Sequence, residues 1–216
     1  DSSVSAYLLK EAGYEVVGVY MQCWNVENDG CGANEDKMYA VQAAAKLGIK
    51  FESLNFISEY RQKVISYFFN EYRAGRTPNP DVMCNKEIKF GIFFDWAMKN
   101  DFDYVATGHY ARIEKLEDGF RLLKGVDDLK ETLFPVGGMK KTEIRKLAKE
   151  LELPTATRPD STGICFIGEV DIKEFLKQEI KPKTGKVVLK DGTVIGKHDG
   201  VWFYTIGQRR GFSVSK

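Results

Sequence analysis

The sequence contains no apolar segment near the roughly 18 residues that a membrane-spanning helix requires. It also contains no stretch with the positive, apolar and small-residue pattern of a secretory signal. We therefore expect a protein that does not enter a membrane and that resides in the cytoplasm, where thiols stay reduced.

Cysteine and histidine are scarce, which argues against a disulfide-rich protein and against a zinc-binding protein. No C-x-x-C pair occurs, and seven residues separate the first two cysteines. Neither a scaffold of disulfide bridges nor a zinc site is therefore expected, and the thiols should serve chemistry or the core. The four cysteines and two histidines of the sequence are Cys23, Cys31, Cys84, Cys165, His109 and His198.

What the chain does contain is the composition of a globular protein. Hydrophobic residues make up 43% and charged residues 29% of the 216 residues, enough for one full domain and part of a second. The net charge is only +1, yet residues 181–216 hold eight basic residues against two acidic ones. Such a segment favours a polyanionic partner, although a solvated basic face would have the same composition.

Helix and strand patterns alternate through the first half of the chain. Gly13 and Gly48 are placed to end helices, Asn34 is placed to cap one, and short runs rich in β-formers lie between them. This alternation predicts an α/β fold with a doubly wound parallel sheet, in which ligands bind beyond the carboxyl ends of the strands. Helices are expected at 4–11, 34–47, 58–74 and 85–99, and strands at 15–21, 50–55 and 103–107.

The later chain changes character, with a hairpin, two helical patterns and then short strands from Gly185 onward. We place a domain boundary near residue 168, so that residues 1–168 form the α/β domain and residues 169–216 begin a small, β-rich second domain. Turns are expected at Asp118-Gly119, Asp191-Gly192 and Asp199-Gly200, and helices at 140–151 and 170–179.

The stretch TPNPDVMCNKEIKFG, residues 77–91, places Cys84 between a proline-containing loop and a predicted helix. A thiolate at the first turn of a helix is stabilised by the helix dipole, and Lys86 and Lys89 add positive charge nearby. Polar neighbours such as Asn85 favour this interpretation over a buried structural cysteine, which remains the alternative. Cys84 is therefore a candidate reactive thiol.

Cys165 lies in a second polar segment, RPDSTGICFIGE, where Gly163 and Gly168 permit unusual backbone angles. Two isolated cysteines in two such segments suggest a pair that meets in space. One thiol could carry a sulfur atom and the other could release it by disulfide exchange.

The opening residues Asp1, Ser2 and Ser3 allow two interpretations. They can be the end of a phosphate-binding loop whose N–H groups and helix N-terminus hold a pyrophosphate. They can equally be an ordinary helix N-cap.

Six motifs then occur in one order: DSSVSAYLL, GRTPNPDVMCNKEIKF, ATGHYAR, LFPVGG, DSTGICFIGE and YTIGQRRG. Together they resemble the tRNA-specific 2-thiouridylases, which make 2-thiouridine at the wobble position of certain tRNAs and contain an N-type ATP-pyrophosphatase domain. The resemblance covers nearly the whole chain and includes both cysteine segments.

The resemblance implies nucleotide-binding residues and two catalytic thiols. Asp1 and Ser2 correspond to the end of the family's S-G-G-V-D-S phosphate loop. Met21 corresponds to a contact with the adenine of ATP, and Gly108 to another nucleotide contact. By the same comparison Cys84 is the catalytic nucleophile, and the persulfide carrier is Cys165.

The resemblance also implies the RNA contacts and the order of the chemistry. Asn79, Pro80 and Asp81 correspond to the loop at the target base, and His109 to a tRNA contact. ATP, together with Mg²⁺, would adenylate the C2 oxygen of the wobble uridine. Persulfide sulfur would then attack C2, and the second thiol would release the product by forming a disulfide. Asp81 is a candidate general acid or base, or a carboxylate that only accepts hydrogen bonds.

The implied partners are the wobble-uridine tRNAs for Lys, Glu and Gln, and a sulfur donor that is either a cysteine desulfurase or a relay protein. Relative to the family, the chain lacks the strand and S-G-G-V residues before Asp1, a K-D-Q-S-type segment between residues 130 and 131, and a β-barrel after Lys216. We expect unobserved segments and not natural deletions, with a shortened, inactive protein as the alternative.

Two rival functions differ in what they predict. Another ATP-pyrophosphatase, such as a 4-thiouridine or 2-thiocytidine tRNA-modifying enzyme or an amide-forming ligase, would share the fold but not both cysteine motifs. A redox-responsive RNA-binding module, whose two cysteines form a regulatory disulfide, would turn over no ATP.

Overall fold

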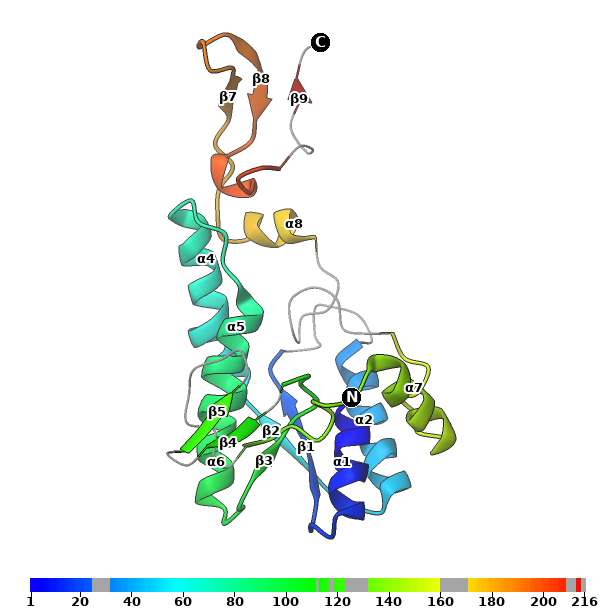
Figure 1. The fold of residues 1–216 in the computed structure, drawn as a ribbon. Coiled ribbons are helices and arrows are strands. Elements are labelled where there is room, and N and C mark those ends of the chain that lie inside the picture. Colours follow the sequence, from blue (N-terminus) through cyan, green and yellow to red (C-terminus); the bar gives the residue numbers. More distant parts are fainter. Residues whose placement is uncertain are drawn as a thin grey trace. The chain divides into compact units, whose positions relative to one another are not determined.

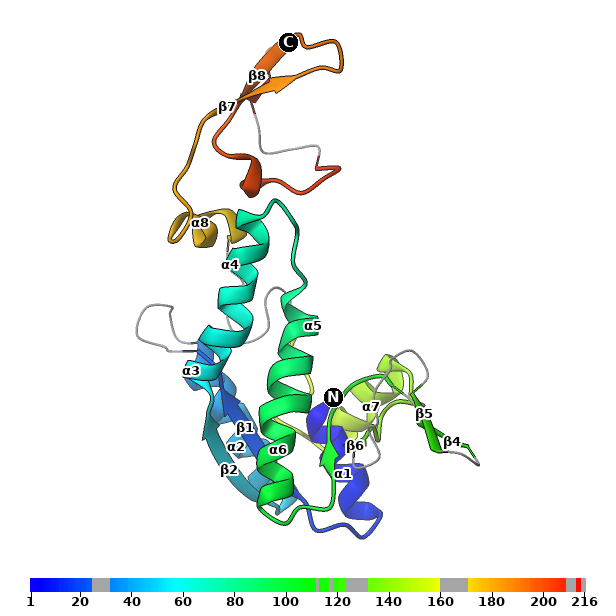
Figure 2. The same cartoon turned by 90° about the vertical axis from the view of Figure 1, so that its left-hand side faces the viewer.

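The structure of the chain is a computed structural model that describes residues 1–24, 32–111, 113–116, 119–122, 132–159, 171–208 and 213–214. The chain divides into two compact units (Figures 1 and 2). The first unit consists of Asp1–Ile57 and Ile88–Asp160, and the second of Ser58–Glu87 and Ser161–Lys216. The boundary predicted near residue 168 lies outside the described residues and stays a prediction.

Parallel strand pairs form the sheet structure of the first unit. β1 (Val17–Gln22) pairs with β2 (Lys50–Asn55) in parallel, from Val17 opposite Lys50 to Gln22 opposite Asn55. β3 (Val105–Ala106) pairs in parallel with β6 (Thr132–Leu133). The predicted α/β class with parallel strands is therefore confirmed, although the described residues show two separate pairs and not one continuous sheet.

Four helices accompany these strands. Figure 1 shows α1 (Ser2–Glu11), α2 (Gly32–Leu47) and α7 (Lys141–Glu150) on one side of the strands and α6 (Phe93–Lys99) on the other. This arrangement covers the strands on both sides, as expected for parallel strands that are joined by helical crossovers.

Glycines end two of these helices as predicted, but one predicted cap is wrong. Gly13 follows α1 with φ of 90°, and Gly48 follows α2 with φ of 61°, backbone angles that a residue without a Cβ adopts readily. α2 begins at Gly32, so Asn34 lies inside the helix and is not its N-cap. A preference for a cap residue is a weak local signal that tertiary context overrides.

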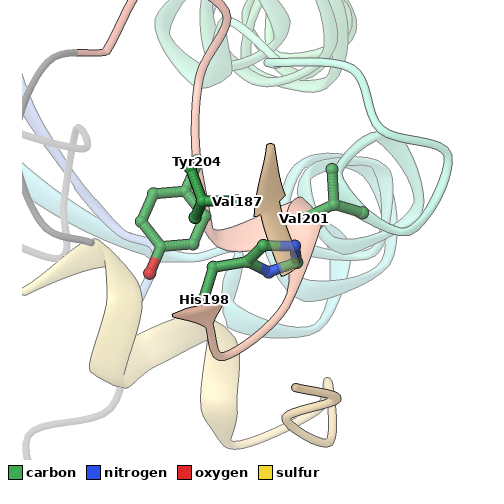
Figure 3. Close-up of a pocket in the computed structure, with 4 residues that line it drawn as sticks. All are labelled: Val187, His198, Val201 and Tyr204. Atoms are coloured by element: carbon green, nitrogen blue, oxygen red, sulfur yellow. The ribbon is translucent and has the colours of Figure 1, made fainter. Parts of the chain in front are cut away.

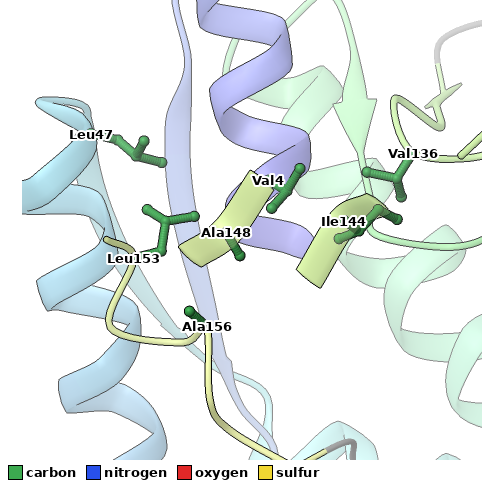
Figure 4. Packing of buried hydrophobic residues seen from close by; sticks show 7 residues of the cluster. All are labelled: Val4, Leu47, Val136, Ile144, Ala148, Leu153 and Ala156. Atoms are coloured by element: carbon green, nitrogen blue, oxygen red, sulfur yellow. The ribbon is translucent and has the colours of Figure 1, made fainter. Parts of the chain in front are cut away.

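The core of the first unit is a cluster of seven buried side chains from α1, α2, α7 and the segments that flank α7 (Figure 4). On α7, Ile144 and Ala148 are four residues apart and therefore share one helix face. Burying a large aliphatic side chain contributes about 1.5–3 kcal/mol, so this cluster fixes α7 against α1. The seven residues are Val4, Leu47, Val136, Ile144, Ala148, Leu153 and Ala156.

The predicted hairpin is present in the first unit, although Asp118 of its predicted turn lies outside the described residues. β4 (Ile113–Leu116) and β5 (Gly119–Leu122) are antiparallel, and Leu116 is opposite Gly119. Gly119 is thus the first residue of β5 and not part of the turn.

Two interrupted helices differ more from the prediction. The helix expected at 58–74 is built from α3 (Ile57–Tyr60), the π-helix η2 (Arg61–Ile65) and α4 (Ser66–Arg73). The helix expected at 85–99 begins five residues early, with α5 (Pro80–Cys84), and continues as the π-helix η3 (Asn85–Ile92) into α6. The loop predicted at NPDVMC is therefore mostly helical.

Aromatic packing holds part of the second unit together. The rings of Phe68 and Phe69 on α4 lie 5.9 Å and 5.2 Å from the ring of Phe175 on α8 (Ile172–Lys177). All three side chains are buried, so α8 is anchored on α4.

A small antiparallel sheet completes the described part of the second unit, as the β-rich pattern predicted. β8 (Val194–His198) pairs with β7 (Gly185–Val188) and β9 (Ser213–Val214). The predicted turn at Asp191-Gly192 is present, with φ of 89° at Gly192. The short 3₁₀-helix η4 (Val201–Phe203) follows Gly200. Among the helices described, none is long and apolar enough to cross a bilayer.

Replacing Ile144 with alanine should lower the free energy of unfolding by about 2–5 kcal/mol, because it leaves a cavity in the core beneath α7. Chemical denaturation of the purified protein measures the change. Thr142→Ala is the matched control on the exposed face of the same helix and should change stability by less than about 0.5 kcal/mol. Equal effects of the two substitutions would contradict the assigned core.

Candidate functional site

Two segments expected to bind the nucleotide lie against each other in the first unit. A Cβ atom added to Gly108, just after β3, would lie 2.7 Å from the backbone nitrogen of Ser2 and 2.8 Å from Cβ of Asp1. Real Cβ atoms essentially never approach this closely, so only glycine permits this contact. The structure therefore brings Gly108 together with Asp1 and Ser2, across more than 100 positions of sequence.

The carboxylate of Asp1 contacts two residues that were not predicted from the sequence. It accepts a hydrogen bond from the Tyr110 hydroxyl at 2.9 Å, and the Lys141 ammonium donates to both of its oxygens at 2.9 Å. The same ammonium lies 5.6 Å from the centre of the Tyr110 ring. Asp1 makes no side-chain capping bond to α1, so its carboxylate is used for these contacts and not as an ordinary N-cap.

The arrangement suits an anionic ligand such as a nucleotide phosphate. The N-terminus of α1 carries partial positive charge, and beside it lies the Lys141 ammonium at the first position of α7, which the Asp1 carboxylate neutralises. Gly108 keeps side-chain atoms away from the backbone there. Within the residues that the structure describes, no group of three histidine, cysteine or acidic side chains could hold a metal ion.

Met21 is half-buried near the carboxyl end of β1 and lies opposite Leu54 of β2. Figure 1 shows this end of β1 at the same end of the first unit as the N-terminus of α1. Cys23 follows the strand and is buried, at 2% exposed.

A charged cluster lies beside the same end of β1 and was not predicted. Arg158 forms an ion pair with Asp36 on α2, and its guanidinium lies 5.0 Å from the centre of the Tyr39 ring. Burial raises the pKa of Tyr20 and the negative charge of Asp36 raises it further, whereas the positive charge of Arg158 lowers it. Arg158 is the first residue of the segment RPDSTGICFIGE, so its ion pair with Asp36 attaches the start of that segment to α2.

His109, a predicted tRNA contact, is a half-buried ring in an aromatic setting. Its Nδ1 lies 2.7 Å from the Thr107 hydroxyl, and its ring lies 5.6 Å from Phe90 and 6.2 Å from Phe134. Burial lowers the pKa of His109, and the charge of Lys89 lowers it further. The ring is therefore neutral at physiological pH and suited to hydrogen bonding or stacking, not to neutralising a phosphate.

The predicted base-contact residues form the start of α5 in the second unit. Asn79 caps the helix, because its side-chain oxygen accepts from the backbone N–H of Val82 at 3.1 Å, and Pro80 occupies the first helical position. Asp81 is exposed in the first turn. The helix-start pattern Asn-Pro-Asp was present in the sequence and would have located this boundary.

The expected position of Cys84 in a first turn is wrong. The helix begins at Pro80, so Cys84 is the fifth helical residue, and its side chain is fully buried. The dipole effect falls off beyond the first turn, so the helix dipole does little to make the Cys84 thiol more acidic. Cys165, the proposed partner, and Cys31 lie outside the described residues.

Comparison with known proteins gives an independent result. The family model described as the tRNA methyl transferase HUP domain matches residues 1–169, and the tRNA methyl transferase PRC-barrel domain matches residues 173–216. The first match covers well over half of the chain.

Curated relatives agree with these matches. Proteins named tRNA-specific 2-thiouridylase MnmA from Shouchella clausii, Enterococcus faecalis and Listeria monocytogenes are 48%, 49% and 47% identical to the chain, and each alignment covers 99% of it. The chain spans 64%, 62% and 62% of the length of these relatives. By sequence, by its parallel α/β domain and by the order of its motifs, the chain belongs to the tRNA-specific 2-thiouridylase family.

Proposed function

We propose that the chain forms the catalytic part of an ATP-dependent tRNA 2-thiouridylase, which converts the wobble uridine to 2-thiouridine. Relatives that are identical to the chain at about half of the aligned residues carry this activity in their names. The structural observation that carries the proposal is the contact of Gly108 with Asp1 and Ser2, because it assembles one anion site from two segments expected to bind ATP.

Residues of the first unit would bind and orient the nucleotide. The HUP domain implies ATP use, and ATP supplies the adenylyl group that turns the uridine C2 oxygen into a leaving group. The N-terminus of α1 and Lys141 would hold phosphate oxygens, and Met21 would lie beside the adenine. Mg²⁺ would accompany the nucleotide, because it is usually bound through substrate phosphates together with one or two carboxylates.

The thiols of Cys165 and Cys84 would transfer the sulfur atom to the base in two steps. The terminal persulfide sulfur on Cys165 attacks C2, and AMP leaves with the electron pair of the C–O bond. The Cys84 thiolate then attacks the inner sulfur on Cys165, which breaks the S–S bond and leaves the outer sulfur on the base. A Cys84–Cys165 disulfide results and has to be reduced before the next turnover.

Several observations support this division of roles. Cys84 and α8, which begins seven residues after Cys165, both belong to the second unit, and α8 is anchored there by Phe175. Asp81 is exposed and lies three residues before Cys84 on the same short helix, and it would act on the base as a general acid or base. Asn79, Pro80 and His109 would contact the RNA.

The remaining assignments follow from the same proposal. Residues 1–168 would form the ATP-pyrophosphatase catalytic domain, and residues 169–216 would begin the central tRNA-binding domain; the extents of the two family matches support this boundary. The substrates would be the tRNAs for Lys, Glu and Gln in the cytoplasm. A cysteine desulfurase or a relay protein would supply the sulfur.

The Cys165→Ser variant of the full-length protein should lose thiolation of unmodified tRNA, yet release pyrophosphate from ATP at a near-normal rate, because adenylation precedes sulfur transfer. Mass spectrometry of nucleosides and a pyrophosphate assay measure the two steps. Cys31→Ser is the control and should retain both. Thiolation by Cys165→Ser would exclude Cys165 as the carrier.

The Cys84→Ala variant should accumulate tRNA joined to Cys165 through a disulfide, because the thiol that releases the product is missing. Denaturing gel electrophoresis should show this adduct, and dithiothreitol should convert it to thiolated tRNA. Full turnover without an adduct would remove Cys84 from the mechanism.

Gly108→Ala should weaken binding of a non-hydrolysable ATP analogue at least about tenfold. The added methyl group would clash with Asp1 and Ser2, and overpacking of this kind costs about 1–3 kcal/mol. Titration calorimetry measures the affinity, and thermal denaturation confirms that the variant is folded. Gly138→Ala is the matched control, since a Cβ there would have no atom within 4 Å. Unchanged affinity in Gly108→Ala would separate this contact from nucleotide binding.

A further inference from the structure

Two lysines lie directly opposite each other in the small sheet of the second unit. Lys186 of β7 and Lys197 of β8 are partners in the antiparallel register. Directly opposite residues in such a pair point to the same face, with Cα atoms about 4.5–5.5 Å apart. Both side chains are exposed.

Like charges in this position repel each other and destabilise the pairing of the strands. In the part of the chain that the structure describes, neither lysine forms an ion pair. The two acidic residues of this region are engaged elsewhere. Asp191 accepts a hydrogen bond from the backbone N–H of Thr193 at 2.9 Å within the turn. Asp199 is paired with another lysine.

The contacts of Asp199 also fix the base of the hairpin. Lys173 of α8 lies 2.7 Å from one carboxylate oxygen, and the Tyr204 hydroxyl donates to the other at 2.6 Å. These partners, Lys173 first, lower the pKa of Asp199 to about 2, so the carboxylate stays charged and committed to them. Its backbone oxygen accepts from the N–H of Lys183 at 2.8 Å. Within the described part of residues 181–216, both acidic side chains are therefore committed to partners other than Lys186 and Lys197.

The opposite face of the same hairpin is apolar. Val187 and His198 alternate with the two lysines along their strands, and together with Val201 and Tyr204 they line a pocket of about 180 Å³ (Figure 3). The hairpin thus separates a packed, apolar face from a face on which positive charge is concentrated. An anion bound between the two exposed ammonium groups would relieve the repulsion on that second face.

We propose that Lys186 and Lys197 together bind one phosphate of the RNA backbone. The inference rests on the proposed function for the presence of RNA, but it assigns a site that the comparison with relatives does not. Two adjacent ammonium groups on flexible stems act as point charges that can converge on a single phosphodiester. Binding of a polyanion such as RNA also releases its condensed counterions into solution, and the entropy of this release favours binding. An isolated carboxylate has no such counterion layer to release.

The test measures tRNA affinity of the full-length protein by fluorescence anisotropy over a range of salt concentrations. Lys186→Gln, Lys197→Gln and the double variant should each fold, because the positions are exposed. Each single change should weaken binding about five- to tenfold at 0.1 M salt and reduce the slope of log K against log salt by about 1. Lys190→Gln, in the turn of the same hairpin, removes the same charge outside the pair and should change affinity less than about twofold.

Stability gives a second readout that a structural role would not produce. Lys186→Glu places a carboxylate opposite Lys197, so we expect the melting temperature to rise by about 1–2 °C while tRNA affinity falls at least as far as in Lys186→Gln. This opposite response of stability and affinity is what the proposal requires.

Affinity and salt slope that are unchanged in the double variant would overturn the proposal, even if an acidic protein partner then proved to need the two lysines. An equal loss in Lys190→Gln would also overturn it, because general charge would then control binding. Unchanged affinity with normal thiolation would leave the proposed function intact, whereas a wild-type protein that binds no tRNA would remove both.

Discussion

The close approach of Gly108 to the first residues of α1 is the contact on which the geometry of the first unit depends. It brings the end of β3 to the N-terminus of a helix, and this position allows Tyr110 and Lys141 to reach Asp1. The buried cluster beneath α7 holds Lys141 in place, because Ile144 and Ala148 fix the helix on which it lies. The hydrophobic core therefore determines the position of the Lys141 ammonium group.

The residues expected to act on nucleotide and on sulfur belong to different units. Asp1, Met21 and Gly108 are in the first unit, and Asp81 and Cys84 are in the second. The π-helix η3 begins directly after Cys84 and includes the boundary between the units. π-helical segments are rare and occur frequently at functional sites, although η2 shows that this chain contains a second one.

Local signals in the sequence predicted the elements well where one residue determines the backbone. Gly13 and Gly48 ended their helices because the left-handed conformation favours glycine, and the alternation of helix and strand gave the α/β class. The start of α5 was missed because its prolines were taken as loop residues, although the order Asn79, Pro80, Asp81 is typical of a helix start.

The site itself was only partly predictable. The approach of Gly108 to Ser2 and the contact of Lys141 with Asp1 join residues more than 100 positions apart, and no local pattern encodes such a pair. The segment around Cys165 lies outside the described residues, so its meeting with Cys84 stays a prediction.

The burial of Cys84 changes the physical argument for its role. A thiol in the second turn of a helix gains little from the helix dipole, and a fully buried one does not meet oxidants dissolved in water. A nucleophile that attacks a disulfide within the same molecule does not need to be exposed to solvent, since its target is delivered by the chain. Protection from solvent and reaction with an internal sulfur are therefore compatible. Reactivity at Cys84 would depend on the arrival of that sulfur and not on a permanently exposed thiolate.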